Sequence, residues 1–120
     1  MEEWKLDFEW LRIKHLLVEK LELEKMPDLN AILVLIGIRE LGTYENSFSK
    51  EEKQDLMHVA VCTLLEDLYY EFVGVDADGW PHWIPIKKLD QQGVKAQEEL
   101  LKKRIVHYFN RIYETPSAEG

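Results

Sequence analysis

The sequence has a single cysteine and no hydrophobic run long enough to cross a bilayer. Cys62 has no second cysteine with which to form an intrachain disulfide, so packing must stabilise the fold, as it does in reducing compartments. The longest unbroken apolar stretch, residues 31–38, is far shorter than the roughly 20 residues of a transmembrane helix. The start MEEWKLDFEW lacks the basic and apolar regions of a secretory signal peptide. The sequence therefore predicts a soluble cytoplasmic protein without membrane contact.

Positive charge is also scarce, because 15 lysines and arginines face 23 acidic residues, giving a net charge of −8. A negative field repels the phosphate backbone of nucleic acids, so nucleic acid is an unlikely partner on charge alone. The charge is uneven, however: residues 87–113 carry seven cations and three anions, a net +4, and the rest of the chain carries −12. We expect these opposite charges to meet within one molecule or across a symmetric dimer rather than to form a nucleic-acid footprint.

Apolar periodicity predicts four helices. The first covers about residues 6–23, and Asp28 and Gly42 suit the two ends of the second. Ser49 and Glu52 form a predicted capping box for the third helix, which runs to about residue 67. The fourth spans residues 94–113, with Glu98–Lys102 and Glu99–Lys103 as predicted stabilising pairs. Its expected apolar stripe consists of Leu101, Ile105, Tyr108 and Ile112.

Helical spacing gives way to a β-hairpin pattern in residues 69–86, YYEFVGVDADGWPHWIPI, which hold five of the 13 aromatic residues of the chain. Asp78-Gly79 suits a two-residue turn, and residues 76–79 equally suit a type I turn with a glycine bulge, so the strand register stays open. Pro81 and Pro85 are four residues apart, so their backbone nitrogens, which carry no amide hydrogen, face the same side of the second strand. That side must be a free edge or a ligand-facing one, and protection of the edge from aggregation is the favoured reading.

These elements predict an α+β fold that is mainly α, with four helices and one two-stranded antiparallel hairpin between the third and fourth helices. Residues 1–113 are expected to form a single globular domain, followed by a disordered tail at residues 114–120. The order of elements is also that of a winged-helix regulator. In that arrangement the third helix would enter the DNA groove, but it offers only Lys50, Lys53 and Gln54 beside a surplus of acids.

Three segments carry a resemblance to known proteins: LNAILVLIGIRELG, KEEKQDLMHVAVCTLL and the hairpin ending DGWPHW. Together they make the chain similar, up to Tyr113, to a family of small uncharacterised bacterial cytoplasmic proteins. The resemblance implies a single bacterial domain. It implies no activity, cofactor or catalytic residue.

Chemistry-bearing side chains are sparse. His58 and Cys62 are four residues apart and so share a helix face, and His82 and His107 are the only further histidines outside the first helix. These four are weak candidates for a zinc site or for a cysteine nucleophile with a histidine base. No CxxC or HExxH spacing accompanies them, and Cys62 lies in an apolar run where cysteine usually packs as a small hydrophobe. We therefore predict no catalytic residue, no metal and no cofactor.

The leading functional hypothesis is a non-enzymatic protein-interaction or self-associating module. Its expected partner is a protein, and a second copy of the chain in a homodimer is one such partner. Large rigid aromatic rings make good interface anchors, and they make equally good core residues. The predicted contact residues are Tyr70, Phe72, Trp80 and Trp83 in the hairpin, with Tyr108 and Ile112 in the last helix. A winged-helix-like transcriptional regulator is the alternative, and a metal or thiol enzyme using His58 and Cys62 is a weaker one.

Overall fold

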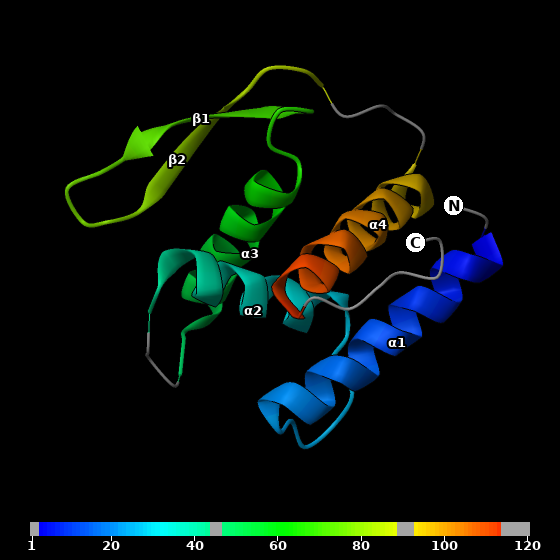
Figure 1. The fold of residues 1–120 in the computed structure, drawn as a ribbon. Helices are drawn as coiled ribbons and strands as arrows, with labels where there is room; N and C mark the ends of the chain where they lie inside the picture. The colour runs from blue at the N-terminus through cyan, green and yellow to red at the C-terminus, as the bar shows by residue number, and fades with distance from the viewer. Residues whose placement is uncertain (1–2, 44–46, 89–92, 114–120) are drawn as a thin grey trace. The chain divides into compact units, whose positions relative to one another are not determined.

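The structure, a computed structural model, describes residues 3–43, 47–88 and 93–113. Within them the element order is α1 (Glu3–Leu21), α2 (Leu29–Leu41), α3 (Lys50–Leu64), β1 (Tyr70–Val75), β2 (Pro81–Pro85) and α4 (Val94–Tyr113) (Figure 1). The predicted class is confirmed: the fold is α+β, mainly α, with an antiparallel hairpin between α3 and α4. The tail predicted to be disordered, residues 114–120, lies outside the described residues. None of the described helices is both long enough and apolar enough to cross a membrane.

The elements group into two compact units. The first contains α1 and α4, and the second contains α2, α3 and the hairpin. The single domain expected over residues 1–113 stays a prediction.

In the first unit, α1 and α4 lie side by side and run in the same direction (Figure 1). Their fully buried residues are Leu6, Ile13, Leu17, Ile105, Val106 and Phe109, together with Glu9. The buried face of α4 is rotated from the predicted stripe, because Ile105 belongs to both but Tyr108 and Ile112 are only half-buried. Both sets of α4 residues have helical spacing, so periodicity alone does not choose between them.

Polar contacts tie α1 to α4. The carboxylate of Glu9, whose residue is only 1% exposed, is ion-paired with Arg12, and the same guanidinium donates to the Asn110 side-chain oxygen at 2.6 Å. The ammonium of Lys102 lies 5.6 Å from the centroid of the Trp10 ring, a cation–π contact. The predicted pairs Glu98–Lys102 and Glu99–Lys103 are not among the ion pairs of the described residues.

In the second unit, α2 begins and ends as predicted. The Asp28 side chain accepts a hydrogen bond from the Ala31 amide, and Gly42 adopts the left-handed conformation with φ of 76°. The helix packs closely on α3 at Gly37, where an added Cβ would lie 2.2 Å from the carbonyl oxygen of Leu56. A glycine is therefore required for this approach of the two backbones.

The capping box predicted at the start of α3 is also present, since Ser49 accepts from the Glu52 amide while Glu52 accepts from the Ser49 amide. The first turns of α3 are exposed and its carboxyl half is largely buried. The helix ends at Leu64, three residues before the predicted limit. Asp67 takes a left-handed conformation there, and its amide donates to the Tyr70 carbonyl, so the chain turns into β1.

Candidate interaction surface

The hairpin turn settles the register that the sequence leaves open. The Gly79 amide donates to the Asp76 carbonyl at 3.1 Å, and the Asp76 amide donates to the Trp80 carbonyl at 2.9 Å. With Gly79 at φ of 88°, this is the turn over residues 76–79 followed by a glycine bulge. One carboxylate oxygen of Asp76 also accepts from the amides of residues 78 and 80, and the other lies 2.7 Å from Nε2 of His82.

The strand pairing defines two faces of the hairpin. Tyr70 pairs with Pro85, Phe72 with Trp83, and Val75 with Pro81, so these six residues share one face, here called the Trp83 face. The opposite face, here called the Ile84 face, carries Glu71, His82, Ile84 and Ile86. Val73 is the extra residue of a β-bulge between Phe72 and Gly74.

The Trp83 face is anchored at its base beside α3. The indole Nε1–H of Trp83 donates to Glu66 Oε1 at 2.9 Å, just beyond the end of the helix. The Trp83 ring meets the Phe72 ring edge-on, with centroids 5.6 Å apart. Burial raises the pKa of Tyr70, and the nearby Cys62 thiol raises it further. Trp83 and Tyr70 are half-buried, whereas Phe72 and Val75 on the same face are exposed.

The Ile84 face is exposed along its whole length, since Glu71, His82, Ile84 and Ile86 all face solvent. Figure 1 shows the hairpin starting at the carboxyl end of α3 and extending so that its turn lies away from that helix. The hairpin therefore presents large apolar side chains on both faces: Phe72, Val73, Val75, Ile84 and Ile86.

Two prolines and a β-bulge interrupt the outer edges of the hairpin. The Ile86 amide donates to the Tyr69 carbonyl on the β1 side, so the nitrogens of Pro81 and Pro85 point to the outer edge of β2. These prolines therefore lie on an outer edge of the two-stranded sheet that pairs with no further strand among the described residues, as one of the two sequence readings predicts. On the other edge the bulge at Val73 breaks the regular pattern of β1. Strand addition at these edges is therefore disfavoured.

The remaining predicted contact residues lie on less accessible surface. Trp80 is half-buried at the turn. Tyr108 and Ile112 are half-buried on α4, where the Tyr108 ring meets the Phe109 ring edge-on at 5.1 Å. The structure therefore brings Phe72 and Trp83 together at one surface, while the hairpin and α4 belong to different units.

The four weak metal or thiol candidates divide into separate places. Cys62 Sγ lies 3.6 Å from Nε2 of His58, whereas His82 is engaged with Asp76 at the hairpin turn and His107 is exposed on α4. No group of three or more metal-ligating side chains occurs among the described residues. Burial raises the pKa of the Cys62 thiol to about 11. This is the opposite of the thiolate stabilisation that a cysteine nucleophile needs.

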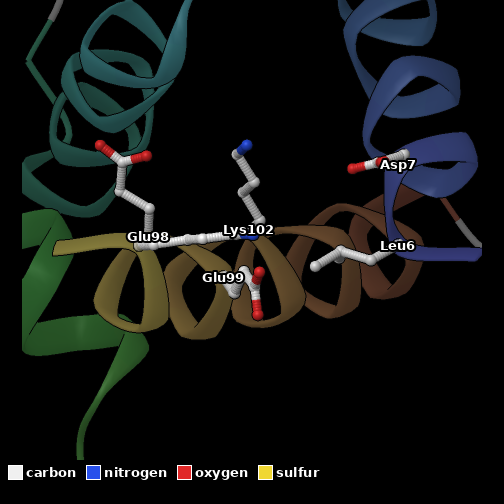
Figure 2. A pocket seen from close by; sticks show the side chains of 6 residues that line it. Leu6, Asp7, Glu98, Glu99 and Lys102 are labelled. Atoms are coloured by element: carbon white, nitrogen blue, oxygen red, sulfur yellow. The ribbon is translucent and has the colours of Figure 1, made fainter. Parts of the chain in front are cut away.

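A pocket of about 230 Å³ lies between α1 and α4 (Figure 2). It is lined by Leu6, Asp7, Lys95, Glu98, Glu99 and Lys102. Figure 2 shows that the Glu98 carboxylate and the Lys102 ammonium stand apart at its rim. Its cations and anions nearly balance, and Asp7, Lys95 and Glu98 are exposed to water. The pocket therefore lacks the buried, convergent polar groups that fix a small ligand.

Two sets of exposed apolar residues were missed by the sequence analysis. Ile84 and Ile86 alternate with Trp83 along β2, so the pattern does place them on the face opposite the tryptophan. On α1, Trp4, Phe8 and Leu11 recur at helical spacing but on the side opposite Ile13. The spacing signal is therefore present in the sequence for both sets.

The order of helices and strands agrees with a winged-helix regulator, but the exposed groups do not favour DNA. The exposed start of α3 carries Glu51, Glu52 and Asp55 beside its two lysines, and the hairpin turn carries Asp76 and Asp78. A wing or recognition helix needs cations at these positions to neutralise phosphates.

Comparison of the chain with protein-family models, with curated proteins and with solved structures gives no match.

Proposed function

We propose that this protein is a non-enzymatic interaction module that binds another protein chain through the faces of its β-hairpin. The observation that carries the proposal is the exposure of large apolar side chains on both faces of β1 and β2. An isolated two-stranded hairpin is marginally stable in water, and a sheet normally covers at least one face. The bond from Trp83 to Glu66 joins the middle of β2 to the segment after α3 and leaves Phe72, Val75, Ile84 and Ile86 exposed, so a partner is the natural cover for these residues.

The interrupted edges support the same conclusion. Pro81 and Pro85 remove two amide donors from the outer edge of β2, which disfavours aggregation by strand addition. The side-chain faces stay open, so specificity would come from apolar contacts such as Ile84 and Ile86 with a polar rim. The edge-on pair of Phe72 and Trp83 provides a rigid aromatic element of the kind found at binding hot spots.

The charge of this part of the chain favours a different protein as the partner over the hairpin of a second copy. Residues 28–90 carry 12 acidic and five basic side chains, which accounts for −7 of the total charge of −8. Glu71, Asp78 and Asp67 are exposed around the apolar faces. The exposed cations Lys87 and Lys88 lie beyond β2. Two hairpins placed face to face with their turns together would therefore bring like charges together, whereas a partner with cations around its apolar surface would meet opposite charge.

Replacement of both exposed isoleucines by glutamate tests the proposal. Three baits are compared by affinity capture: the native chain, the Ile84→Glu/Ile86→Glu variant and the Val94→Glu variant. Each bait is incubated with a lysate of the cells in which the protein naturally occurs, and the captured proteins are measured by quantitative mass spectrometry. Val94 is a matched control because it is an exposed apolar residue on α4, outside the hairpin. We expect a protein that the native and Val94→Glu baits retain and the double variant loses by at least about tenfold.

Captured candidates are then purified and titrated by isothermal calorimetry against the same three chains. Circular dichroism confirms that the variants keep their helix content. The proposal fails if every captured protein binds the double variant as tightly as it binds the native chain.

A second candidate function, a winged-helix-like regulator of transcription, rests on the order of the elements alone. A mobility-shift titration with duplex DNA at two salt concentrations tests it. The negative charge around α3 and the turn predicts no shift even at low salt. A specific, salt-sensitive shift would favour this candidate over the interaction module.

A further inference from the structure

Helix α1 carries two apolar stripes on opposite sides. The first consists of the buried residues Leu6, Ile13 and Leu17. The second, here called the outer stripe, consists of Trp4, Phe8 and Leu11, which are 65%, 59% and 50% exposed. At about 100° per residue, positions 4, 8 and 11 fall on one face. A surface helix of a monomer normally keeps that side polar, so the outer stripe marks a contact surface.

The charges beside the outer stripe distinguish between its conceivable occupants. Asp7 and Lys14 lie on the same flank of the stripe, one helical repeat of seven residues apart. Asp7 is exposed and Lys14 is half-buried. The midpoint of this pair lies about one residue, roughly 1.5 Å along the axis, from the midpoint between Phe8 and Leu11. A two-fold axis through the middle of the stripe therefore brings each anion close to the cation of a second copy.

We propose that α1 is a homodimerisation surface on which the outer stripe packs antiparallel against the same stripe of a second copy. In this arrangement Phe8 lies opposite Leu11 of the partner subunit, and Leu11 lies opposite Phe8 of the partner subunit. Asp7 then lies beside Lys14 of the partner subunit, and the symmetry repeats the pair. Such an isologous contact is self-complementary in charge along this flank. A parallel pairing would instead set this flank against the other flank of the partner helix, so the two charges would not meet.

This surface is separate from the hairpin, and it suits a second copy for a reason that the hairpin lacks. In the hairpin the exposed charged side chains Glu71, Asp76 and Asp78 are all acidic, and the cations Lys87 and Lys88 follow β2, so a symmetric contact that superposes the two turns brings like charges together. On the flank of the outer stripe, Asp7 lies on one side of the middle of the stripe and Lys14 lies on the other side. Self-association therefore belongs to α1, and the hairpin faces stay available for a different protein.

Charge reversal gives a test that folding defects cannot imitate. The molar mass of the native chain and its variants is measured by sedimentation equilibrium over a concentration series. We expect a native dimer, a dissociation constant raised at least about tenfold in Asp7→Lys and in Lys14→Asp, and recovery in the Asp7→Lys/Lys14→Asp variant. Each single variant creates two repulsive pairs, and the double variant restores both attractive pairs with reversed direction.

Mixing the two single variants provides a second readout. The Asp7→Lys chain has cations at both paired positions and the Lys14→Asp chain has anions at both, so opposite charges meet at each end of a mixed dimer. Native mass spectrometry should therefore show the heterodimer in preference to either homodimer. Phe8→Ser should be monomeric whatever the charges. Val94→Glu, on α4, should leave the dimer unchanged.

Three results would overturn the proposal. The native chain could stay monomeric up to its solubility limit, the charge-reversed double variant could fail to recover, or Ile84→Glu/Ile86→Glu could dissociate the dimer while Phe8→Ser does not. The last result would move self-association to the hairpin. None of them affects the capture experiment, because a monomer can still bind a different protein through the hairpin faces.

Discussion

The indole Nε1–H of Trp83 donates to the carboxylate of Glu66 at 2.9 Å, and this bond ties the middle of β2 to the segment that follows α3. The two residues are 17 positions apart in the chain. Both are half-buried, so water competes only partly with the bond. This charge-assisted contact therefore holds the hairpin beside the end of α3, together with the backbone hydrogen bond from the Asp67 amide to the Tyr70 carbonyl.

Removal of this bond should destabilise the protein measurably. Trp83→Phe keeps an aromatic ring against Phe72 but has no donor for Glu66, so we expect a loss of about 1–2 kcal/mol in the free energy of unfolding. Urea denaturation followed by circular dichroism measures it. Glu66→Gln is the control, because its amide oxygen can still accept the bond, and it should cost less. Equal stability of Trp83→Phe and the native chain would show that the contact contributes nothing.

Gly37→Ala should be among the more damaging small substitutions in the chain. The new Cβ would lie 2.2 Å from the Leu56 carbonyl oxygen, so α2 and α3 would have to separate. We expect a loss of about 2 kcal/mol or more in unfolding free energy, although alanine favours helix. Gly42→Ala is the comparison, since a Cβ there has no neighbour within 4 Å and meets only the cost of a positive φ, about 1 kcal/mol. The prediction is wrong if Gly42→Ala is the more destabilised of the two.

Cys62 should react slowly with thiol reagents in the folded protein. Burial raises its pKa to about 11, so about one thiol in ten thousand is ionised at pH 7. We expect labelling by iodoacetamide to be at least about tenfold slower than in urea-unfolded protein, and to accelerate as the pH approaches 11. Fast labelling of the native chain at pH 7 would contradict the burial of this side chain.

The same pKa shift makes the stability of the protein depend on alkaline pH. The unfolded thiol has a pKa near 8.5, so between about pH 8.5 and 11 the unfolded state has lost a proton that the folded state retains. Stability should therefore be full below this window and fall as the pH rises through it. Urea denaturation at several pH values, repeated on Cys62→Val, measures the contribution, because the variant should show a shallower decline. The raised pKa of Tyr70 acts in the same direction and should leave a residual slope.

Asp76 should titrate at lower pH than an ordinary aspartate. The hydrogen bond with His82 is the main cause of its lowered pKa, followed by the Trp80 amide. The stabilisation of the turn is thus present above the unfolded pKa of about 3.9 and is lost as the pH falls through the lower folded value. Carboxyl carbon chemical shifts from NMR measure the midpoint directly. In His82→Ala the midpoint should move back towards the ordinary value, and an unchanged midpoint would assign the shift to the backbone amides alone.

Several local features could be predicted from the sequence because they depend on neighbouring residues. Asp28, Gly42, and the pair Ser49 and Glu52 occupy the predicted helix ends, since capping joins groups within four positions of each other. The hairpin between α3 and α4 follows in the same way from its turn residues and alternating pattern. That Pro81 and Pro85 face the same edge of β2 also follows from the sequence, because residues an even number of positions apart in a strand point their backbone nitrogens to the same side.

Other features required contacts between distant residues. The sequence of α4 contains two sets of apolar residues with helical spacing, and the set that is buried in the structure includes Val106 and Phe109. Lys102 lies over Trp10 rather than pairing with Glu98, because a ring on α1 offers it a second partner. The extent of exposure of Phe72 and Ile84 also had no local signature, since an alternating apolar strand looks the same whether its faces are covered or open.

By itself, therefore, the amino-acid sequence determined both ends of α2, the start of α3, the class of the fold and the acidic character of residues 28–90. These depend on short-range hydrogen bonds, on periodicity and on formal charge, all of which can be read along the chain. The tertiary structure alone decided which apolar residues are buried, that Gly37 faces a backbone carbonyl, and that Trp4, Phe8 and Leu11 stay in water. Burial is a property of the neighbours that surround a side chain, and those neighbours come from distant parts of the sequence.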